Sequence, residues 1–280
     1  MTSQIKTVFL LLLLSGLMLL MGQAIGGQSG LMTALAFALL MNVGSYWFSD
    51  KIVLRMYNAR ELSPDDAPML HRVVEELAAE ARIPKPRVCL MPDESPNAFA
   101  TGRNPEHGVV AVTSGIVRLL SPEELRGVLA HETAHIANRD ILVQTVAGVI
   151  ATVIMYLGHM LQWAAMFSGS NRNRQGAGLL GGLLLAVLAP IAASLIQFAI
   201  SRSREYLADA TGARFARDPL ALAAALGKLD GYARQIPMRT QSAATAHMFI
   251  VAPFAGGGIT SLFSTHPPVA DRIARLQAMA

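Results

Sequence analysis

The composition of this 280-residue chain is not that of a soluble protein, although its length would allow one large or two small domains. Apolar residues make up 52% of the chain and charged residues 15%, whereas about 25% of the residues in a typical soluble domain are charged. The net charge of +4 would suit a nucleic-acid-binding protein, but the basic residues lie beside apolar runs and form no single patch, so we expect a lipid bilayer as partner and no nucleic acid.

Two uncharged apolar runs predict a first transmembrane hairpin over residues 1–50. As helices, residues 8–25 and 31–48 would each be about 27 Å long, which covers most of a bilayer core. A turn of sequence Gly-Gly-Gln-Ser-Gly lies between them. The alternative for the first run is a secretory signal, but the run is long for one and a second run follows at once, so we favour a retained anchor.

The charges beside this hairpin predict its orientation. Lys6 precedes the first run, and Lys51, Arg55 and Arg60 follow the second, so the basic flanks lie on one side of the membrane. Positive residues favour the cytoplasmic side, and we therefore expect both ends of the hairpin to be cytoplasmic.

Residues 51–140 are predicted to form the first part of a soluble domain. Apolar residues recur at helical spacing within residues 64–83. The β-rich runs at residues 87–91 and 109–113 predict strands, and residues 97–101 between them are compatible with a third. The pattern indicates a small sheet packed with helices.

Residues 121–140, SPEELRGVLAHETAHIANRD, are predicted to be a helix with a well-defined start. Ser121 is a favoured N-cap residue, Pro122 suits the first helical position, and Glu124 completes a capping box with Ser121.

On this helix, His131 and His135 share one face and Glu132 lies beside them. Two neutral imidazoles on adjacent turns can bind zinc, and a carboxylate next to the open coordination position can act as a base. A motif of this kind also arises by chance, so the hypothesis requires a third ligand.

Residues 141–167 and 176–200 are two further apolar runs and predict a second transmembrane hairpin over residues 141–200. Their turn, residues 168–174, would then lie outside, although its two arginines oppose the positive-inside rule. Two re-entrant segments are the alternative, and they would also return the chain to the same side.

The third ligand is predicted in the sequence Ser-Arg-Glu-Tyr-Leu-Ala-Asp. Glu205 and Asp209 share a helical face, so one carboxylate can bind zinc while the other accepts a hydrogen bond from a ligand imidazole. A solvated helical face is the alternative. Beside the His-Glu-x-x-His motif we favour Glu205 as the ligand and Asp209 as its supporting group.

At these motifs the chain resembles the HtpX-type membrane proteases, gluzincin metallopeptidases related to the CaaX prenyl protease. The resemblance rests on HETAH at residues 131–135, EYLAD at 205–209, NAFA at 97–100 and THPP at 265–268, and on the apolar runs between them. It implies one zinc ion per chain bound by His131, His135 and Glu205, with Glu132 as the general acid and base.

The resemblance also implies roles for two weaker motifs. A strand made of Asn97, Ala98, Phe99 and Ala100 would border the active-site cleft and pair with an extended substrate. His266 would donate a hydrogen bond to the oxyanion of the reaction. An ordinary loop or strand and a surface histidine are the respective alternatives.

We therefore expect a mainly α integral membrane protein with four transmembrane helices and an α+β gluzincin-like zinc protease domain that contains a small sheet. Residues 51–140 and 201–280 would together form that domain. His135 and Glu205 each lie about five residues from an apolar run, so both ligand-bearing helices are expected to continue transmembrane helices.

The expected function is zinc-dependent cleavage of misfolded or damaged membrane proteins at the cytoplasmic surface of the bacterial inner membrane. Membrane-protein or unfolded-protein chains would be its substrates. A processing protease for lipidated or CaaX-type substrates shares the chemistry and is one alternative. A non-enzymatic zinc-binding membrane adaptor is the other, and it would require a fourth protein ligand that closes the metal site.

Overall fold

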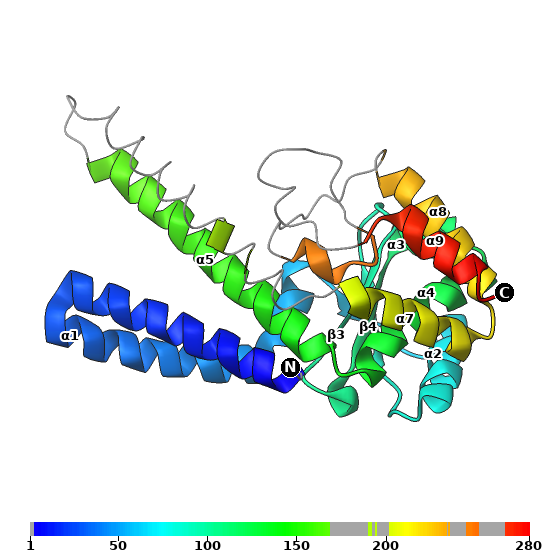
Figure 1. Cartoon of the computed structure of the whole chain (residues 1–280), viewed down its shortest axis with the longest axis horizontal. Coiled ribbons are helices and arrows are strands. Elements are labelled where there is room, and N and C mark those ends of the chain that lie inside the picture. The colour runs from blue at the N-terminus through cyan, green and yellow to red at the C-terminus, as the bar shows by residue number, and fades with distance from the viewer. Residues whose placement is uncertain are drawn as a thin grey trace.

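The computed structural model of the chain describes residues 3–168, 202–233, 245–251 and 267–280, together with the single positions 190, 191, 194 and 235. Two long helical elements, α1 and α5, project from a body that contains the sheet and the remaining helices (Figure 1). The expected turn at residues 168–174 and nearly all of the fourth apolar run lie outside the described residues, and so does His266.

Helix α1 (Ser3–Met56) is a hairpin of two helical halves, as predicted, and its second half extends past the expected end at residue 50. The chain reverses at Gly27, where φ is 56° and ψ is −139°, a conformation that glycine adopts at low cost. The Asn42 side chain donates a hydrogen bond of 2.8 Å to Ser15 Oγ and joins the two halves. Both ends of the hairpin therefore lie next to the body (Figure 1).

The structure corrects the expected number of membrane spans. Among the described residues, one helix, Gly27–Met56, is long and apolar enough to cross a membrane by itself. The first apolar run forms a helix at Ile5–Leu20, which is too short to meet the same criterion. Pro122–Ala137 and Ile141–Met155 meet it only together, and they are bent by 90°. Among the described residues, one or two candidate spans are thus found, not the four expected for the chain, and nearly all of the fourth expected span lies outside these residues.

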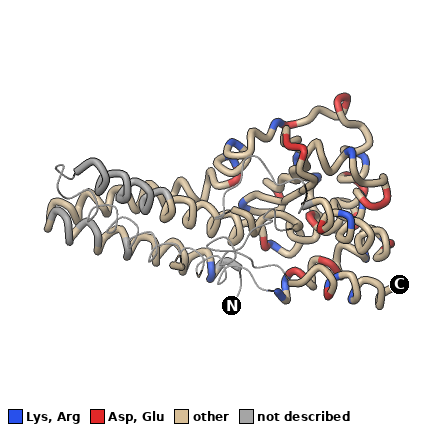
Figure 2. The backbone as a smooth tube through the Cα atoms, turned by 90° about the horizontal axis from the view of Figure 1, so that it is seen from above, with Lys and Arg blue, Asp and Glu red and all other residues tan. Residues whose placement is uncertain are grey.

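Helix α5 (Ile141–Ser168) packs against the base of the hairpin. Leu10 and Leu14 of α1 are buried with Val143 and Ile150 of α5 in one apolar cluster. Figure 2 shows that these projecting elements carry almost no charged residues, whereas Lys, Arg, Asp and Glu gather on the body.

The predicted small sheet is confirmed. It has four strands in the order β1 (Arg60–Glu61), β2 (Arg87–Met91), β4 (Val109–Thr113) and β3 (Ala98–Thr101). Strands β2 and β4 are parallel, whereas β3 is antiparallel to β4 with Phe99 opposite Ala111. The motif strand β3 therefore forms an edge of the sheet.

Helix α4 (Pro122–Ala137) lies at the centre of the body. It contacts β3, α2 (Pro68–Ala81), α7 (Arg202–Ala216) and α8 (Pro219–Ala233). The other described helices are α3 (Ser114–Leu119), α9 (Val269–Gln277) and the short 3-10 helices η1 (Pro105–His107) and η2 (Ala246–Met248). The apolar core around α4 includes Leu77, Val88, Leu129 and Leu226.

The prediction of a helix over residues 121–140 that continues as a transmembrane helix was wrong. Helix α4 ends at Ala137, and a sharp bend, here called the elbow, separates it from α5. Arg139 has a φ of 57° in the left-handed region. The backbone N–H of Asp140 donates to the carbonyl of His135, and that of Arg139 donates to Ile136. These two bonds form a Schellman motif, which ends α4 before α5 begins in a perpendicular direction.

Candidate metal centre

The two histidines of the motif meet on α4 as predicted. The helix begins with the predicted capping box, in which Ser121 and Glu124 each satisfy the other's backbone N–H. One turn separates His131 from His135, so both rings point to the same side, with 3.2 Å between their Nε2 atoms. Both side chains are buried.

Glu205 reaches this pair from α7. Its two carboxylate oxygens lie 3.5 Å from His135 Nε2 and 3.9 Å from His131 Nε2. Helix α7 can come this close because Gly212 faces α4: a Cβ atom at this position would lie 2.8 Å from His131 Cα. The absence of a side chain at Gly212 therefore allows the third ligand to reach the two histidines.

The donor atoms fit a tetrahedral zinc ion. Zinc bonds of about 2.0–2.1 Å to nitrogen and oxygen place neighbouring donors of a tetrahedron about 3.3 Å apart. The observed separations of 3.2 and 3.5 Å are close to this value, and the 3.9 Å between Glu205 Oε2 and His131 Nε2 is longer. Among the described residues, the metal-ligating group comprises only His131, His135 and Glu205, which leaves a fourth position open. Three protein ligands and one open position are typical of catalytic zinc sites.

Glu132 is buried between the metal ligands and the edge strand. Its carboxylate accepts a hydrogen bond from the backbone N–H of Ala100 in β3. Burial raises the pKa of Glu132 to about 7, because the charged form is poorly solvated there. A carboxylate with such a pKa can take up and release a proton near neutral pH.

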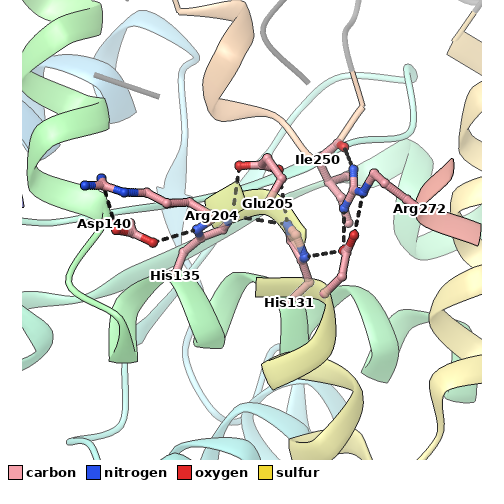
Figure 3. Close-up of polar contacts among 8 residues, drawn as sticks. His131, His135, Asp140, Arg204, Glu205, Ile250 and Arg272 are labelled. Carbon is pink, nitrogen blue, oxygen red and sulfur yellow. Dashed lines mark hydrogen bonds and ion pairs between the residues drawn. The ribbon is translucent and has the colours of Figure 1, made fainter. Parts of the chain in front are cut away.

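Asp209 and Arg272 hold His131 in place; Asp209 is the unlabelled carboxylate joined by dashed lines to His131 and Arg272 in Figure 3. Asp209 Oδ1 lies 2.9 Å from His131 Nδ1, so the imidazole donates its proton there and directs Nε2 to the metal position. Arg272 donates two hydrogen bonds of 2.8 and 2.7 Å to the Asp209 carboxylate, and a third to the carbonyl of Ile250. Burial would raise the pKa of Asp209, but the Arg272 guanidinium holds it well below its usual range.

Sequence reasoning missed the role of Arg272, although the sequence carries an indication of it. Arg272 is fully buried. It lies on the same face of α9 as Val269, Ile273 and Leu276, at the spacing of an apolar helical stripe. A charged residue within such a stripe needs a buried partner of opposite charge. Asp209 is that partner.

A second supporting group lies on the other side of the site. Asp140 Oδ2 is 3.7 Å from His135 Nδ1, and Asp140 Oδ1 is 3.2 Å from a guanidinium nitrogen of Arg204 (Figure 3). Burial lowers the pKa of His135, but Glu205, Asp140 and Glu132 together outweigh it and raise the pKa to about 9. These three carboxylates therefore stabilise a positive charge at the His135 ring.

The predicted substrate strand does border the site, and part of its free edge is in contact with another segment of this chain. The carbonyl of Ala98 accepts a 3.1 Å hydrogen bond from the N–H of Ile250. The Asn97 amide donates a 2.9 Å hydrogen bond to the carbonyl of Val251. Phe99 packs edge-on against Phe249, with 5.3 Å between ring centroids. The role of residues 97–100 in substrate binding remains a prediction.

Replacing Asp209 with alanine is expected to weaken zinc binding or activity by about 10- to 100-fold, because His131 loses the acceptor that fixes its tautomer. Metal content after dialysis against a graded chelator series measures the effect. Glu205→Ala, which removes a ligand itself, should lose metal at lower chelator concentrations than Asp209→Ala. The same chelator sensitivity for Asp209→Ala and the wild type would contradict a supporting role for Asp209.

Comparison with known proteins assigns the family. The model of peptidase family M48 matches residues 64–280. A protease HtpX homolog of Syntrophobacter fumaroxidans is 56% identical over 282 residues, which cover 100% of both chains. One from Persephonella marina is 57% identical over 99% of this chain and 97% of that one. Among solved structures, S. mikatae Ste24p matches with a TM-score of 0.49 and 18% identity over 98% of this chain and 64% of that one.

Proposed function

The chain belongs to peptidase family M48, with HtpX-type metalloproteases among its relatives, and from this premise we propose that it cuts membrane-protein and unfolded-protein substrates at the surface of the bilayer. Its metal is proposed to be one zinc ion per chain. The Lys6, Lys51 and Arg55 flanks of α1 support a body on the cytoplasmic side, at the inner face of the bacterial cytoplasmic membrane. We propose that its cellular task is the removal of misfolded or damaged membrane proteins.

The side chains of the site account for peptide hydrolysis. His131, His135 and Glu205 would hold the zinc ion, which would polarise the scissile carbonyl as a Lewis acid and lower the pKa of water. Glu132 takes the proton of the attacking water and delivers it to the leaving amine. Asp209 keeps the Nδ1 proton on His131. The Ala100 N–H holds the Glu132 carboxylate beside the edge strand, where an extended substrate would lie.

One observation carries the membrane-surface proposal: the metal ligands lie at the base of the projecting apolar elements. His135 is in the last turn of α4, and the apolar helix α5 begins at Ile141, only six residues later. The elbow keeps the site in the body, while α5 and α1 leave it from neighbouring positions and diverge toward their far ends (Figure 1). A cleft held at this height is positioned for polypeptide at the membrane boundary, because tethering raises the effective concentration of substrate.

The test compares one cleavable sequence in two forms in vesicles that contain the full-length enzyme. We expect the form anchored by a transmembrane helix to be cut near its membrane boundary, and at least tenfold faster than the same sequence free in solution. Cleavage sites are located by mass spectrometry. A third substrate that carries a rigid helical spacer of about 30 Å between anchor and cleavable sequence is the control, and its rate should fall toward that of the soluble form. Equal rates for all three would overturn the proposal.

Membership of peptidase family M48 argues against the adaptor alternative, which would require a fourth protein ligand that closes the zinc site. Within the part of the chain that the structure describes, no fourth ligating side chain joins the group.

A further inference from the structure

A cavity of about 780 Å³ opens where the projecting elements meet the body. The first turns of α1, the elbow between α4 and α5, the start of α7 and the loop before η1 enclose it. Its size is that of a small-molecule binding site. None of the three metal ligands lines it, but it adjoins the metal centre: Asp140, which lies 3.7 Å from His135 Nδ1, and Arg204, which precedes Glu205, are both in its lining.

The cavity lining contains more basic than acidic residues. Three arginines line it, Arg103, Arg139 and Arg204, against two acidic residues, Glu106 and Asp140. The Asp140 carboxylate is already paired with Arg204, and Glu106 is exposed to solvent.

Two of the guanidinium groups have no carboxylate partner among the described residues, although Arg103 donates a hydrogen bond of 2.5 Å to His107 Nε2. Among the described residues, no carboxylate lies within ion-pair distance of Arg139 or Arg103. Arg103 stacks over the ring of Trp47 at 4.7 Å, which fixes its guanidinium plane without neutralising its charge. Lys6, which does not line the cavity, lies close enough to interact electrostatically with both Arg204 and Asp140. The cavity therefore carries an excess of positive charge.

The cavity is also lined by apolar residues, namely Val8 and Leu11 of α1, Leu142 of α5 and Leu207 of α7. Val8 is 57% exposed, so this apolar part of the lining is open to the surroundings of the hairpin. Tyr46, which also lines the cavity, and the adjacent Trp47 are residue types that favour the membrane interface.

We propose that this cavity binds the headgroup phosphate of an anionic phospholipid, with Arg139 and Arg103 as its main donors and the acyl chains along Leu11 and Leu142. The proposal rests on the membrane placement proposed above. Guanidinium groups recognise phosphate in a bidentate manner, and basic pockets beside membrane helices on the cytoplasmic side suit anionic headgroups. A soluble phosphate compound would bind the same arginines but would make no contact with the apolar residues of the lining. Its affinity should therefore be lower than that of a phospholipid, so a binding measurement distinguishes the two ligands.

The experiment measures binding of individual lipids to the full-length, zinc-loaded protein in a non-ionic detergent by native mass spectrometry. Phosphatidylglycerol, phosphatidylcholine with the same acyl chains, and glycerol 3-phosphate are the three probes. We expect phosphatidylglycerol to bind at least tenfold more tightly than phosphatidylcholine. Glycerol 3-phosphate should compete only at concentrations at least a hundredfold higher. Equal affinity for the two lipids, or equal potency of glycerol 3-phosphate, would overturn the proposal.

The variant Arg139→Gln tests the site, and Arg217→Gln is its matched control. Both arginines are exposed, both follow a helix end, and both have positive φ, 57° and 58°. Arg139→Gln is expected to weaken phosphatidylglycerol binding about fivefold, which corresponds to about 1 kcal/mol for one basic residue near anionic lipid, while Arg217→Gln leaves it unchanged. An equal loss in both variants would show that general surface charge binds the lipid, and would overturn the site.

Arg139 is four residues from His135, so Arg139→Gln could disturb the metal centre as well as lipid binding. A second variant separates these two effects. Arg103→Gln lies outside α4 and α7 and is expected to show the same fivefold loss with unchanged zinc content. No loss in Arg103→Gln would remove it from the site and contradict the proposal. Protease activity plays no part in these measurements. A protein that binds phosphatidylglycerol as described but cuts anchored and soluble substrates equally would overturn the proposed membrane-surface cleavage and leave the lipid site standing.

Discussion

Replacing Glu132 with glutamine is expected to lower the rate of peptide cleavage by about 10²- to 10⁴-fold, the usual contribution of a general acid and base, while the protein keeps its metal. Glutamine has the same shape as glutamate and its side-chain oxygen can still accept the Ala100 N–H, so the packing of α4 against β3 should persist. Glutamine cannot take a proton from the attacking water. Cleavage of an unfolded protein substrate and the zinc-to-protein ratio are the two measurements.

The control for this variant is Glu123→Gln. Glu123 lies in the exposed first turn of the same helix, so the substitution makes the same charge change on α4 away from the metal ligands. It should leave both the rate and the zinc content unchanged. If Glu132→Gln instead lost its zinc, Glu132 would be a ligand and the assignment of Glu205 as the third ligand would be wrong.

The second large effect is expected for Arg272→Met, which should lower the free energy of unfolding by about 3–5 kcal/mol, the cost of leaving a buried charge without its partner. Arg272 is fully buried, and the carboxylate of Asp209 would lose its two hydrogen bonds to the guanidinium. Denaturant-induced unfolding in detergent, followed by circular dichroism, measures the change.

Two further variants separate the ion pair from a simple loss of packing. Arg275 lies on the same helix, is exposed and stacks on Tyr206, so Arg275→Met should cost less than about 1 kcal/mol. In the double variant Asp209→Asn with Arg272→Met, neither position of the pair carries a charge. Its free energy of unfolding should therefore be higher than that of Arg272→Met alone. A loss below about 1 kcal/mol in Arg272→Met alone would show that the pair does not hold the site together.

Features that depend on local interactions were predicted from the sequence, whereas features that depend on non-local interactions were not. The start of α4, the one-turn spacing of His131 and His135, and strands β2 and β4 were predicted at the observed residues. The hairpin of α1 with its reversal near Gly27 was predicted as well. Capping, helical periodicity and glycine in a turn act between residues a few positions apart, and the sequence displays them directly.

The number of membrane spans shows where local reasoning failed. Apolar composition of residues 141–167 predicted a helix, and α5 is that helix. Composition does not reveal that Arg139 adopts a left-handed conformation and turns the chain by 90°. It also does not reveal that only the second half of the α1 hairpin is long enough to cross a membrane.

The sequence by itself determined which residue types are available for a zinc site and placed two of them on one helical face. Only the tertiary structure decided how the site is completed: Glu205 comes within 3.5 Å of His135 because Gly212 lets α7 pack directly on α4. Likewise, Arg272 reaches Asp209 across 63 positions of the chain. Contacts of this kind depend on the close packing of helices whose relative positions no local pattern specifies, and they become visible only once the chain has folded.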